Sequence, residues 1–225
     1  MPVEPNSAIE ITAFAWVPDF AKGQVRDLRV RWALEEAGLD YRQRLLDAMN
    51  PRPEAYFQEQ PFGQVPAYRD DKVQLFESGA IVLHIGEGSE TLLPRDAAGK
   101  ARATAWLIAA LNSVEPRIME LAIIDFFHAG AEWGRQRRPE VVEMVRRRLS
   151  HLANWLGGKD YLEGRFTAGD LMMTAVLRGL RHTGLVAEQP NLAAYLARCE
   201  ARPGFQRALA AQLESFAENP PAAVA

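Results

Sequence analysis

The sequence predicts two domains, an α/β domain followed by an all-helical domain. Within about the first 88 residues, strand-like and helix-like segments follow the order β-α-β and then β-β-α. Beyond a stretch with three glycines and a proline at residues 86–99, only long amphipathic helical patterns remain. With 225 residues, 48% of them hydrophobic, the chain can bury a sizeable core. We therefore expect domains at 1–88 and 100–225, joined by a linker at 89–99.

The first domain is expected to open with a strand rich in β-branched and aromatic residues. A helix with apolar residues at helical spacing follows and ends at Gly38, because glycine is common just past a helix C-terminus. The expected elements are a strand at 9–16, a helix at 24–37, a strand at 41–46, a helical turn at 54–59, a hairpin with strands at 64–68 and 73–76, and a helix at 78–85.

The second domain is expected to contain helices only, at roughly 100–129, 138–157, 168–184, 191–201 and 203–216. Thr167 and Asp170 stand three residues apart at the start of the third of these helices. That spacing is close to a capping box, with Asp in place of Glu or Gln, and predicts a structural role in starting the helix.

Composition excludes several classes of protein. A formal net charge of −3 argues against a general nucleic-acid binder, and a single cysteine, Cys199, allows no intrachain disulfide. No apolar stretch approaches the roughly 20 residues that span a bilayer, and residues 1–6 lack the features of a secretory signal. The four histidines show no metal-ligand spacing. We expect a cytoplasmic protein without a metal and without nucleic-acid or membrane partners.

The most informative segments are Gln60-Pro-Phe-Gly-Gln-Val-Pro-Ala-Tyr and Leu75-Phe-Glu-Ser-Gly-Ala-Ile. Together they resemble the soluble glutathione transferases of plant and bacterial type, whose pattern is Asn-Pro-x-Gly-x-Val-Pro, a hairpin, and Glu-Ser-x-Ala-Ile. The chain departs from this pattern at Gln60, where the family has Asn. The resemblance extends over about residues 10–215 and implies a thioredoxin-like domain that binds glutathione, a helical domain and a homodimer.

The resemblance also implies a set of glutathione-binding residues. A cis bond between Val65 and Pro66 would turn the Val65 N–H and C=O towards the cysteinyl unit, as an added strand would pair. The start of the helix at Ser78 suits the γ-glutamyl carboxylate, and Glu77 and Gln64 are acceptors for its ammonium group. By its spacing to the proline motif, Arg52 matches a basic residue that grips the glycine carboxylate in many relatives, which its guanidinium can do bidentately. The full set is Arg52, Gln64, Val65, Pro66, Glu77 and Ser78.

The residue that activates the thiol is not identified. Family members use a hydroxyl near the start of the first helix, which would fall near Val25, but residues 14–27 contain no Ser, Thr, Tyr or Cys. Three replacements are open: the Gln24 amide, the Lys22 charge, and the N–H groups at the N-terminus of the first helix. Trp16 offers only its indole N–H and is expected in the core or a pocket wall.

The resemblance implies conjugation of the glutathione thiolate to a small hydrophobic electrophile, with peroxide reduction as a variant. The empty hydroxyl position leaves a second hypothesis open, a glutathione binder or carrier with little catalysis. Aromatic candidates for the wall of the second-substrate pocket are Phe20, Trp106, Phe126, Phe127 and Trp133. Core packing is the alternative explanation for each of them.

Overall fold

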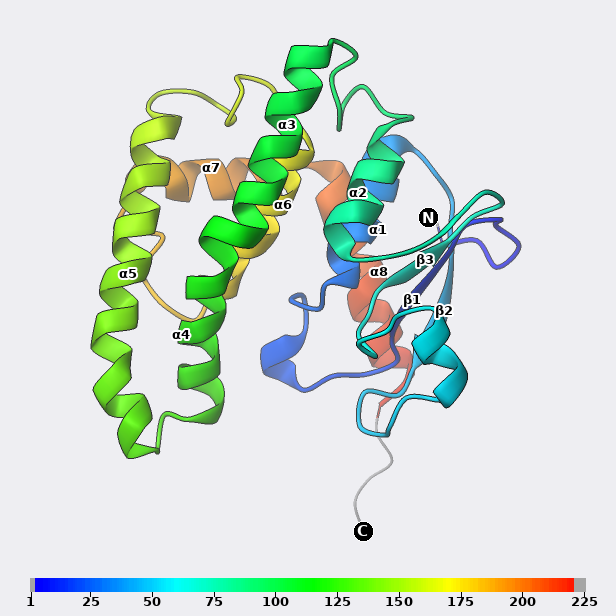
Figure 1. Ribbon diagram of the computed structural model, residues 1–225, viewed down its shortest axis with the longest axis horizontal. Coiled ribbons are helices and arrows are strands. Elements are labelled where there is room, and N and C mark those ends of the chain that lie inside the picture. The colour runs from blue at the N-terminus through cyan, green and yellow to red at the C-terminus, as the bar shows by residue number, and fades with distance from the viewer. Residues whose placement is uncertain (1–2, 221–225) are drawn as a thin grey trace. The chain divides into compact units, whose positions relative to one another are not determined.

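The computed structural model describes residues 3–220. The chain forms two compact units, Met1–Leu92 with Arg202–Ala225, and Leu93–Ala201 (Figure 1). The first unit contains a four-stranded sheet and the second unit is helical, which confirms the predicted fold class.

The sheet of the first unit has the strand order β2-β1-β3-β4. Strand β1 (Glu10–Phe14) pairs in parallel with β2 (Arg42–Leu46) and antiparallel with β3 (Ala67–Arg69), which pairs antiparallel with β4 (Gln74–Phe76). Helix α1 (Asp27–Ala37) connects the two parallel strands, and α2 (Ser78–Gly86) follows β4. The order β-α-β, β-β-α is the one that the sequence predicted.

Helix α1 ends where the sequence indicated. Gly38 has a φ of 67°, a left-handed conformation that glycine adopts without a Cβ clash. The Leu39 N–H reaches back to the Leu34 carbonyl, and the Gly38 N–H reaches back to Glu35. These bonds satisfy the last carbonyls of the helix as a Schellman motif does.

The two faces of the sheet carry different side chains, because successive strand residues point in opposite directions. On β1, Ile11 and Ala13 are buried on one face. Glu10 and Thr12 lie on the other face, with the short helical turn η2 (Glu54–Gln58). Residues of η2 therefore meet the sheet on the same face as the loop that enters β3.

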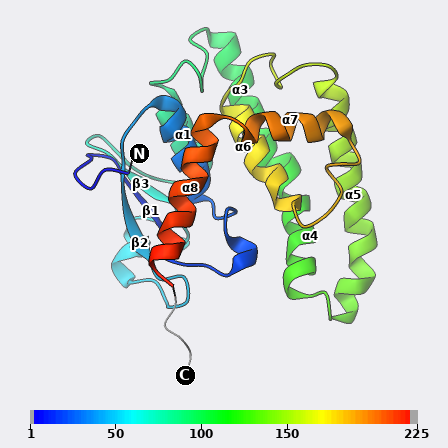
Figure 2. The ribbon, with the colours of Figure 1, turned by 180° about the vertical axis from the view of Figure 1, so that it is seen from behind.

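The last helix, α8 (Pro203–Glu218), packs beside α1 in the first unit (Figure 2). This grouping differs from the predicted 100–225 domain, which placed the segment with the other helices. The physical reason is a buried polar network. Gln212 of α8 donates to Asp27 Oδ1 (2.7 Å), and Asp27 Oδ2 accepts from Arg31 Nε (2.7 Å). Arg31 and Ser215 both donate to Gln43 of β2.

The helical unit contains α3 (Ala97–Ala109), a single wider turn η3 (Ala110–Val114), α4 (Glu115–Phe127), α5 (Glu132–Leu156), α6 (Ala168–Leu177), the short turn η4 (Arg178–Leu180) and α7 (Pro190–Glu200). Helices α4 and α5 lie side by side, as do α3 and α6 (Figure 1).

Several helix boundaries differ from the sequence-based ones; the expected helix at 168–184, for example, ends at Leu177 and is followed by η4. The expected helix at 100–129 is interrupted at η3, which ends two residues before Pro116, a residue with no N–H to donate to the preceding turn. Helix α5 begins at Glu132, before the expected residue 138, and continues through Pro139. The proline forfeits one hydrogen bond within a helix of 25 residues, and the amphipathic face beyond it keeps the helix continuous.

The predicted cap at Thr167 is present. Thr167 Oγ1 accepts from the Gly169 N–H (3.2 Å), and the Asp170 carboxylate accepts from the Thr167 N–H (2.9 Å). Asp170 is fully buried and also accepts from the Leu162 N–H (2.9 Å) and the Tyr195 hydroxyl (3.1 Å). The carboxylate therefore joins the start of α6 to the preceding loop and to α7.

Candidate functional site

The loop between η2 and β3 carries the first part of the candidate site. Its Val65–Pro66 peptide bond is cis, as the resemblance implied. Gln60, the residue that departs from the family pattern, is 2% exposed. Its Oε1 accepts from the backbone N–H groups of Phe62 (2.7 Å) and Gln64 (3.2 Å). Gln60 thus fixes the turn that leads into the cis bond.

Val65 is anchored by its side chain. It packs in a buried cluster with Leu46, Tyr56 and Ala67, against which Phe14 and Val25 also pack. Across residues 3–220, no backbone hydrogen bond uses the N–H or the C=O of Val65. Both groups keep the capacity to pair with an extended peptide, which is the property that a strand-like ligand requires.

The N-terminus of α2 forms the second part. Ser78 is 4% exposed, and the guanidinium of Arg29 on α1 donates to its hydroxyl oxygen (Nη1–Oγ 3.3 Å). Glu77 precedes the helix and is exposed, with a φ of 69° and a ψ of 113°. A non-glycine residue with such a φ carries backbone strain, and strain of this kind concentrates at functional sites. The first N–H groups of α2, with Ser78 and Arg29, make this end of the helix suitable for an anion.

Arg52 is differently placed from the bidentate clamp that the resemblance implied. Its Nε donates to the Gly63 carbonyl (3.1 Å), and its Nη1 donates to the carbonyls of Asn50 (3.0 Å) and Asp47. The guanidinium also lies over the Phe14 ring, 4.7 Å from its centroid. Arg52 therefore holds the segments on either side of η2 together, and only Nη2 remains to meet a carboxylate.

The segment expected to activate the thiol contains a short helical turn that the sequence analysis missed, η1 (Asp19–Ala21). Lys22 forms an ion pair with Asp19 (2.7 Å). Gln24 is half-buried, and its backbone N–H donates to the Ala21 carbonyl (2.9 Å). Val25, at the position of the family hydroxyl, packs against the Val65 cluster. The structure thus brings this position to the cis-proline loop, but with an apolar side chain.

The aromatic candidates for the second-substrate pocket fall in both units. Phe20 lies on η1 and is 40% exposed, while Phe126 and Phe127 lie at the end of α4 and are 40% and 63% exposed. Trp106 is half-buried, packs on Trp155 (5.3 Å between ring centroids) and donates its indole N–H to Glu163 (2.8 Å). Trp133, at the start of α5, is half exposed and lies against the His128 ring.

Sequence reasoning missed Thr12, Tyr56, Gln60 and Arg29 as parts of the site. Thr12 lies on a strand and Tyr56 on a helical turn, 44 residues away, and their side chains meet only in the fold. A polar Thr between the apolar Ile11 and Ala13 in the middle of a strand was the one available signal. Arg29 meets Ser78 across 49 residues in the same way.

Among the described residues, no group of three or more His, Cys, Asp or Glu side chains is arranged to hold a metal ion. Within residues 3–220, no helix combines the length and the apolar character needed to cross a bilayer.

A thioredoxin-like sheet with a cis-proline loop, followed by a helical unit, is the two-domain architecture of the glutathione S-transferase class. The glutathione S-transferase N-terminal domain matches residues 20–87, and the C-terminal domain of the same family matches residues 114–203. The chain belongs to the glutathione S-transferase family.

Individual relatives agree with this assignment. The chain is 30% identical to glutathione S-transferase 4 of Zea mays over 192 residues, which cover 80% of this chain and 85% of the relative. It is also 30% identical to the disulfide-bond oxidoreductase YfcG of Escherichia coli over 57% of this chain and 66% of the relative. A glutathione transferase structure from Burkholderia graminis superposes with a TM-score of 0.80 and 26% identity, covering 90% of this chain and 88% of that one. It holds two glutathione molecules per subunit.

Proposed function

We propose that this protein binds glutathione at the cis-proline loop and conjugates its thiolate to a small hydrophobic electrophile. The observation that carries the proposal is the cis Val65–Pro66 bond, with the Val65 backbone N–H and C=O outside every backbone hydrogen bond of the described residues. An extended cysteinyl unit pairs with these two groups as an added strand does.

The remaining groups of glutathione have partners in the same unit. The γ-glutamyl carboxylate is bound by Ser78 and the first N–H groups of α2, and its ammonium group by Glu77 and Gln64. The glycine carboxylate meets Arg52 through Nη2. Since Arg52 is already engaged by three backbone carbonyls, we assign it a smaller share of the affinity than a bidentate clamp would have.

The thiol is activated without a protein hydroxyl. A free thiol has a pKa of about 8.5, and a helix N-terminus or a nearby donor lowers it. The N-terminus of α1, with the Gln24 amide, supplies this stabilisation at the position where the family has a hydroxyl. Lys22 is paired with Asp19 and therefore contributes less positive potential than an unpaired lysine would.

The test is calorimetric titration of glutathione into the protein, with turnover of a generic aromatic electrophile measured on the same sample. Binding with turnover supports the transferase, and Gln24→Ala should then raise the pKa of the bound thiol seen in the pH–rate profile. Lys22→Ala should have a smaller effect, with Lys72→Ala as a matched control on the exposed β3–β4 turn. Binding without turnover would favour a carrier, and absence of binding at millimolar glutathione would refute the proposal.

A second candidate function is disulfide or peroxide reduction with two glutathione molecules. It is favoured by the two glutathione molecules in the Burkholderia graminis structure and by the activity named for the Escherichia coli relative. Cys199 is fully buried, so both thiols would come from glutathione. One glutathione thiolate attacks the disulfide, forming a mixed disulfide and expelling the first substrate thiolate. The second glutathione thiolate attacks the glutathione sulfur of the mixed disulfide, giving oxidised glutathione and expelling the second substrate thiolate, and both expelled thiolates take up protons. Formation of oxidised glutathione while a model disulfide is reduced would distinguish this reaction from conjugation.

The proposal includes a cytoplasmic homodimer. An exposed aromatic patch on the first unit supports self-association: Phe57, Phe62 and Phe76 are 44%, 67% and 38% exposed, and the rings of Phe62 and Phe76 lie 6.3 Å apart. Exposed apolar patches of this kind mark interaction surfaces. Sedimentation equilibrium of the wild type and of Phe62→Ser measures the oligomeric state directly.

A further inference from the structure

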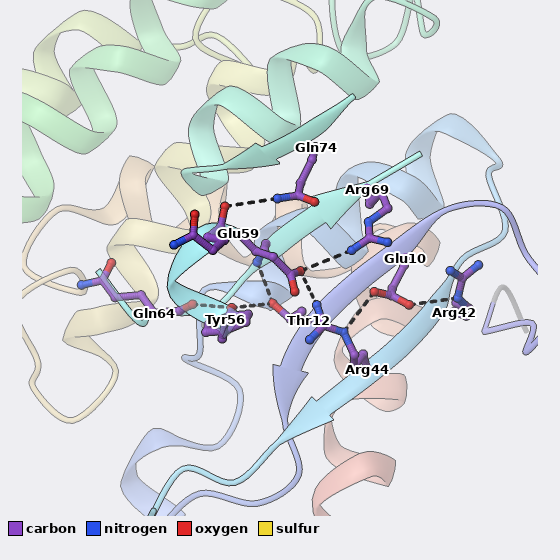
Figure 3. Close-up of polar contacts among 11 residues, drawn as sticks. Glu10, Thr12, Arg42, Arg44, Tyr56, Glu59, Gln64, Arg69 and Gln74 are labelled. Carbon is purple, nitrogen blue, oxygen red and sulfur yellow. Dashed lines mark hydrogen bonds and ion pairs between the residues drawn. The ribbon is translucent and has the colours of Figure 1, made fainter. Parts of the chain in front are cut away.

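Two hydroxyl groups lie directly behind the cis-proline loop. Thr12 Oγ1 on β1 and Tyr56 Oη on η2 are 2.8 Å apart. Tyr56 donates to the carbonyl of Gln64 (2.6 Å), and Thr12 accepts from the Ala67 N–H (2.7 Å). The pair therefore holds the loop on both sides of the cis bond, at the residue before Val65 and at the residue after Pro66 (Figure 3).

The chain of hydrogen bonds runs in one direction. The Ala67 N–H can only donate and the Gln64 carbonyl can only accept, so the two hydroxyl hydrogens between them are ordered. Ala67 donates to Thr12, Thr12 donates to Tyr56, and Tyr56 donates to Gln64. Burial raises the pKa of Tyr56, so the hydroxyl keeps the proton that the last bond requires. Thr12 is 1% exposed, and bonds in such an environment reinforce one another.

A charged cluster holds Tyr56 in place. Glu59, just after η2, pairs with Arg44 of β2 and lies 3.7 Å from Arg69 of β3. Arg44 and Arg42 also pair with Glu10 of β1, at 3.0 and 3.1 Å. Glu59 is therefore tied to strands on both sides of β1, which fixes η2 over the sheet (Figure 3). The position of the Tyr56 hydroxyl follows from this attachment.

We propose that Thr12 and Tyr56 are positioning residues for glutathione. They hold the Val65 backbone at the position where its N–H and C=O pair with the cysteinyl unit. The inference rests on the proposed function. Hydrogen bonds to the Val65 N–H and C=O need donor–acceptor distances near 2.9 Å and weaken steeply when the loop moves by a few tenths of an ångström. Neither hydroxyl touches glutathione; each acts through the loop.

The test compares glutathione affinity across hydroxyl-deletion variants. Tyr56→Phe and Thr12→Val should each raise the Kd for glutathione about fivefold to tenfold, the equivalent of one neutral hydrogen bond. Thr12→Ser restores the hydroxyl and should return the Kd to within about twofold of the wild type. The KM for glutathione should rise in the same proportion, while the KM for the electrophile stays unchanged.

Tyr68→Phe is the matched control. Tyr68 is 3% exposed in the same unit, and its hydroxyl donates to Asp70 (3.0 Å) at the far end of β3. Its removal should leave the Kd within about twofold of the wild type. Thermal unfolding identifies the folded variants, and Tyr56→Phe, which only deletes an oxygen, carries the test if Thr12→Val does not fold.

Three results would overturn the inference. Wild-type affinity in Tyr56→Phe means that the hydroxyl does not position the loop. An equal loss in Tyr68→Phe means that any buried hydroxyl of the unit has the same effect. A wild-type protein that does not bind glutathione removes the proposed function itself, and the inference with it; this result is distinct because it appears before any variant is made.

Discussion

Replacing Asp170 with alanine should strongly destabilise the helical unit. The carboxylate accepts hydrogen bonds from the backbone N–H groups of Leu162 and Thr167 and from the Tyr195 hydroxyl, and none of these residues is more than 1% exposed. Each buried donor left without an acceptor costs about 1–3 kcal/mol. Burial raises the pKa of Asp170, so desolvation of the carboxylate offsets part of the stability that these hydrogen bonds contribute. We expect Asp170→Ala to lower the free energy of unfolding by about 4 kcal/mol.

Urea denaturation followed by far-UV circular dichroism measures this loss. Asp170→Asn keeps one acceptor oxygen and should lose about 2 kcal/mol. In Asp170→Ala the Tyr195 hydroxyl keeps only its long hydrogen bond to the backbone carbonyl of residue 170 (3.4 Å), so adding Tyr195→Phe should recover no more than about 1 kcal/mol. Asp160→Ala is the control, since that side chain is 69% exposed, and it should change stability by no more than about 0.5 kcal/mol. A loss below about 1 kcal/mol in Asp170→Ala would show that these bonds do not support the start of α6.

Three other predictions concern the first unit. Glu77→Gly should relieve the strain of the positive φ and stabilise the fold by about 1 kcal/mol. The same variant should bind glutathione more weakly in calorimetry, because it loses the carboxylate. A destabilised variant would contradict the strain argument. Asp27→Ala should cost about 3–5 kcal/mol in chemical denaturation because it leaves Arg31 buried and unpaired, and adding Arg31→Met should recover much of that loss. Burial alone would raise the pKa of Asp70, but hydrogen bonds from His84 and from the turn outweigh it and lower the pKa below its ordinary 3.8. The stabilisation from Asp70 is therefore complete above the ordinary pKa and is lost as pH falls from there through the lowered pKa of the folded state. Asp70→Asn should flatten the fall in stability below about pH 5, and an unchanged slope would exclude this role.

Several features of this protein were determined by local sequence. The alternation of strand and helix patterns before residue 88, and the loss of strand patterns after it, predicted the fold class. The spacing of Thr167 and Asp170 predicted the cap of α6, and the cis Val65–Pro66 bond was implied by the resemblance of its motif to the family. The lack of a hydroxyl near Val25 was also visible in the sequence. Each of these signals lies within a few residues of the chain, where backbone preference and periodicity act.

Other features were decided only by tertiary structure. Arg52 could be matched to a carboxylate ligand by spacing, but its guanidinium meets three backbone carbonyls that only the folded loops bring together. The sequence predicted helix α8 as one more helix of the second domain, yet Gln212 donates a hydrogen bond to Asp27, 185 residues earlier, in the first unit. Thr12 and Tyr56 meet across 44 residues behind the cis-proline loop. Such contacts have no periodic signature, because they depend on where buried donors find acceptors once the elements have packed.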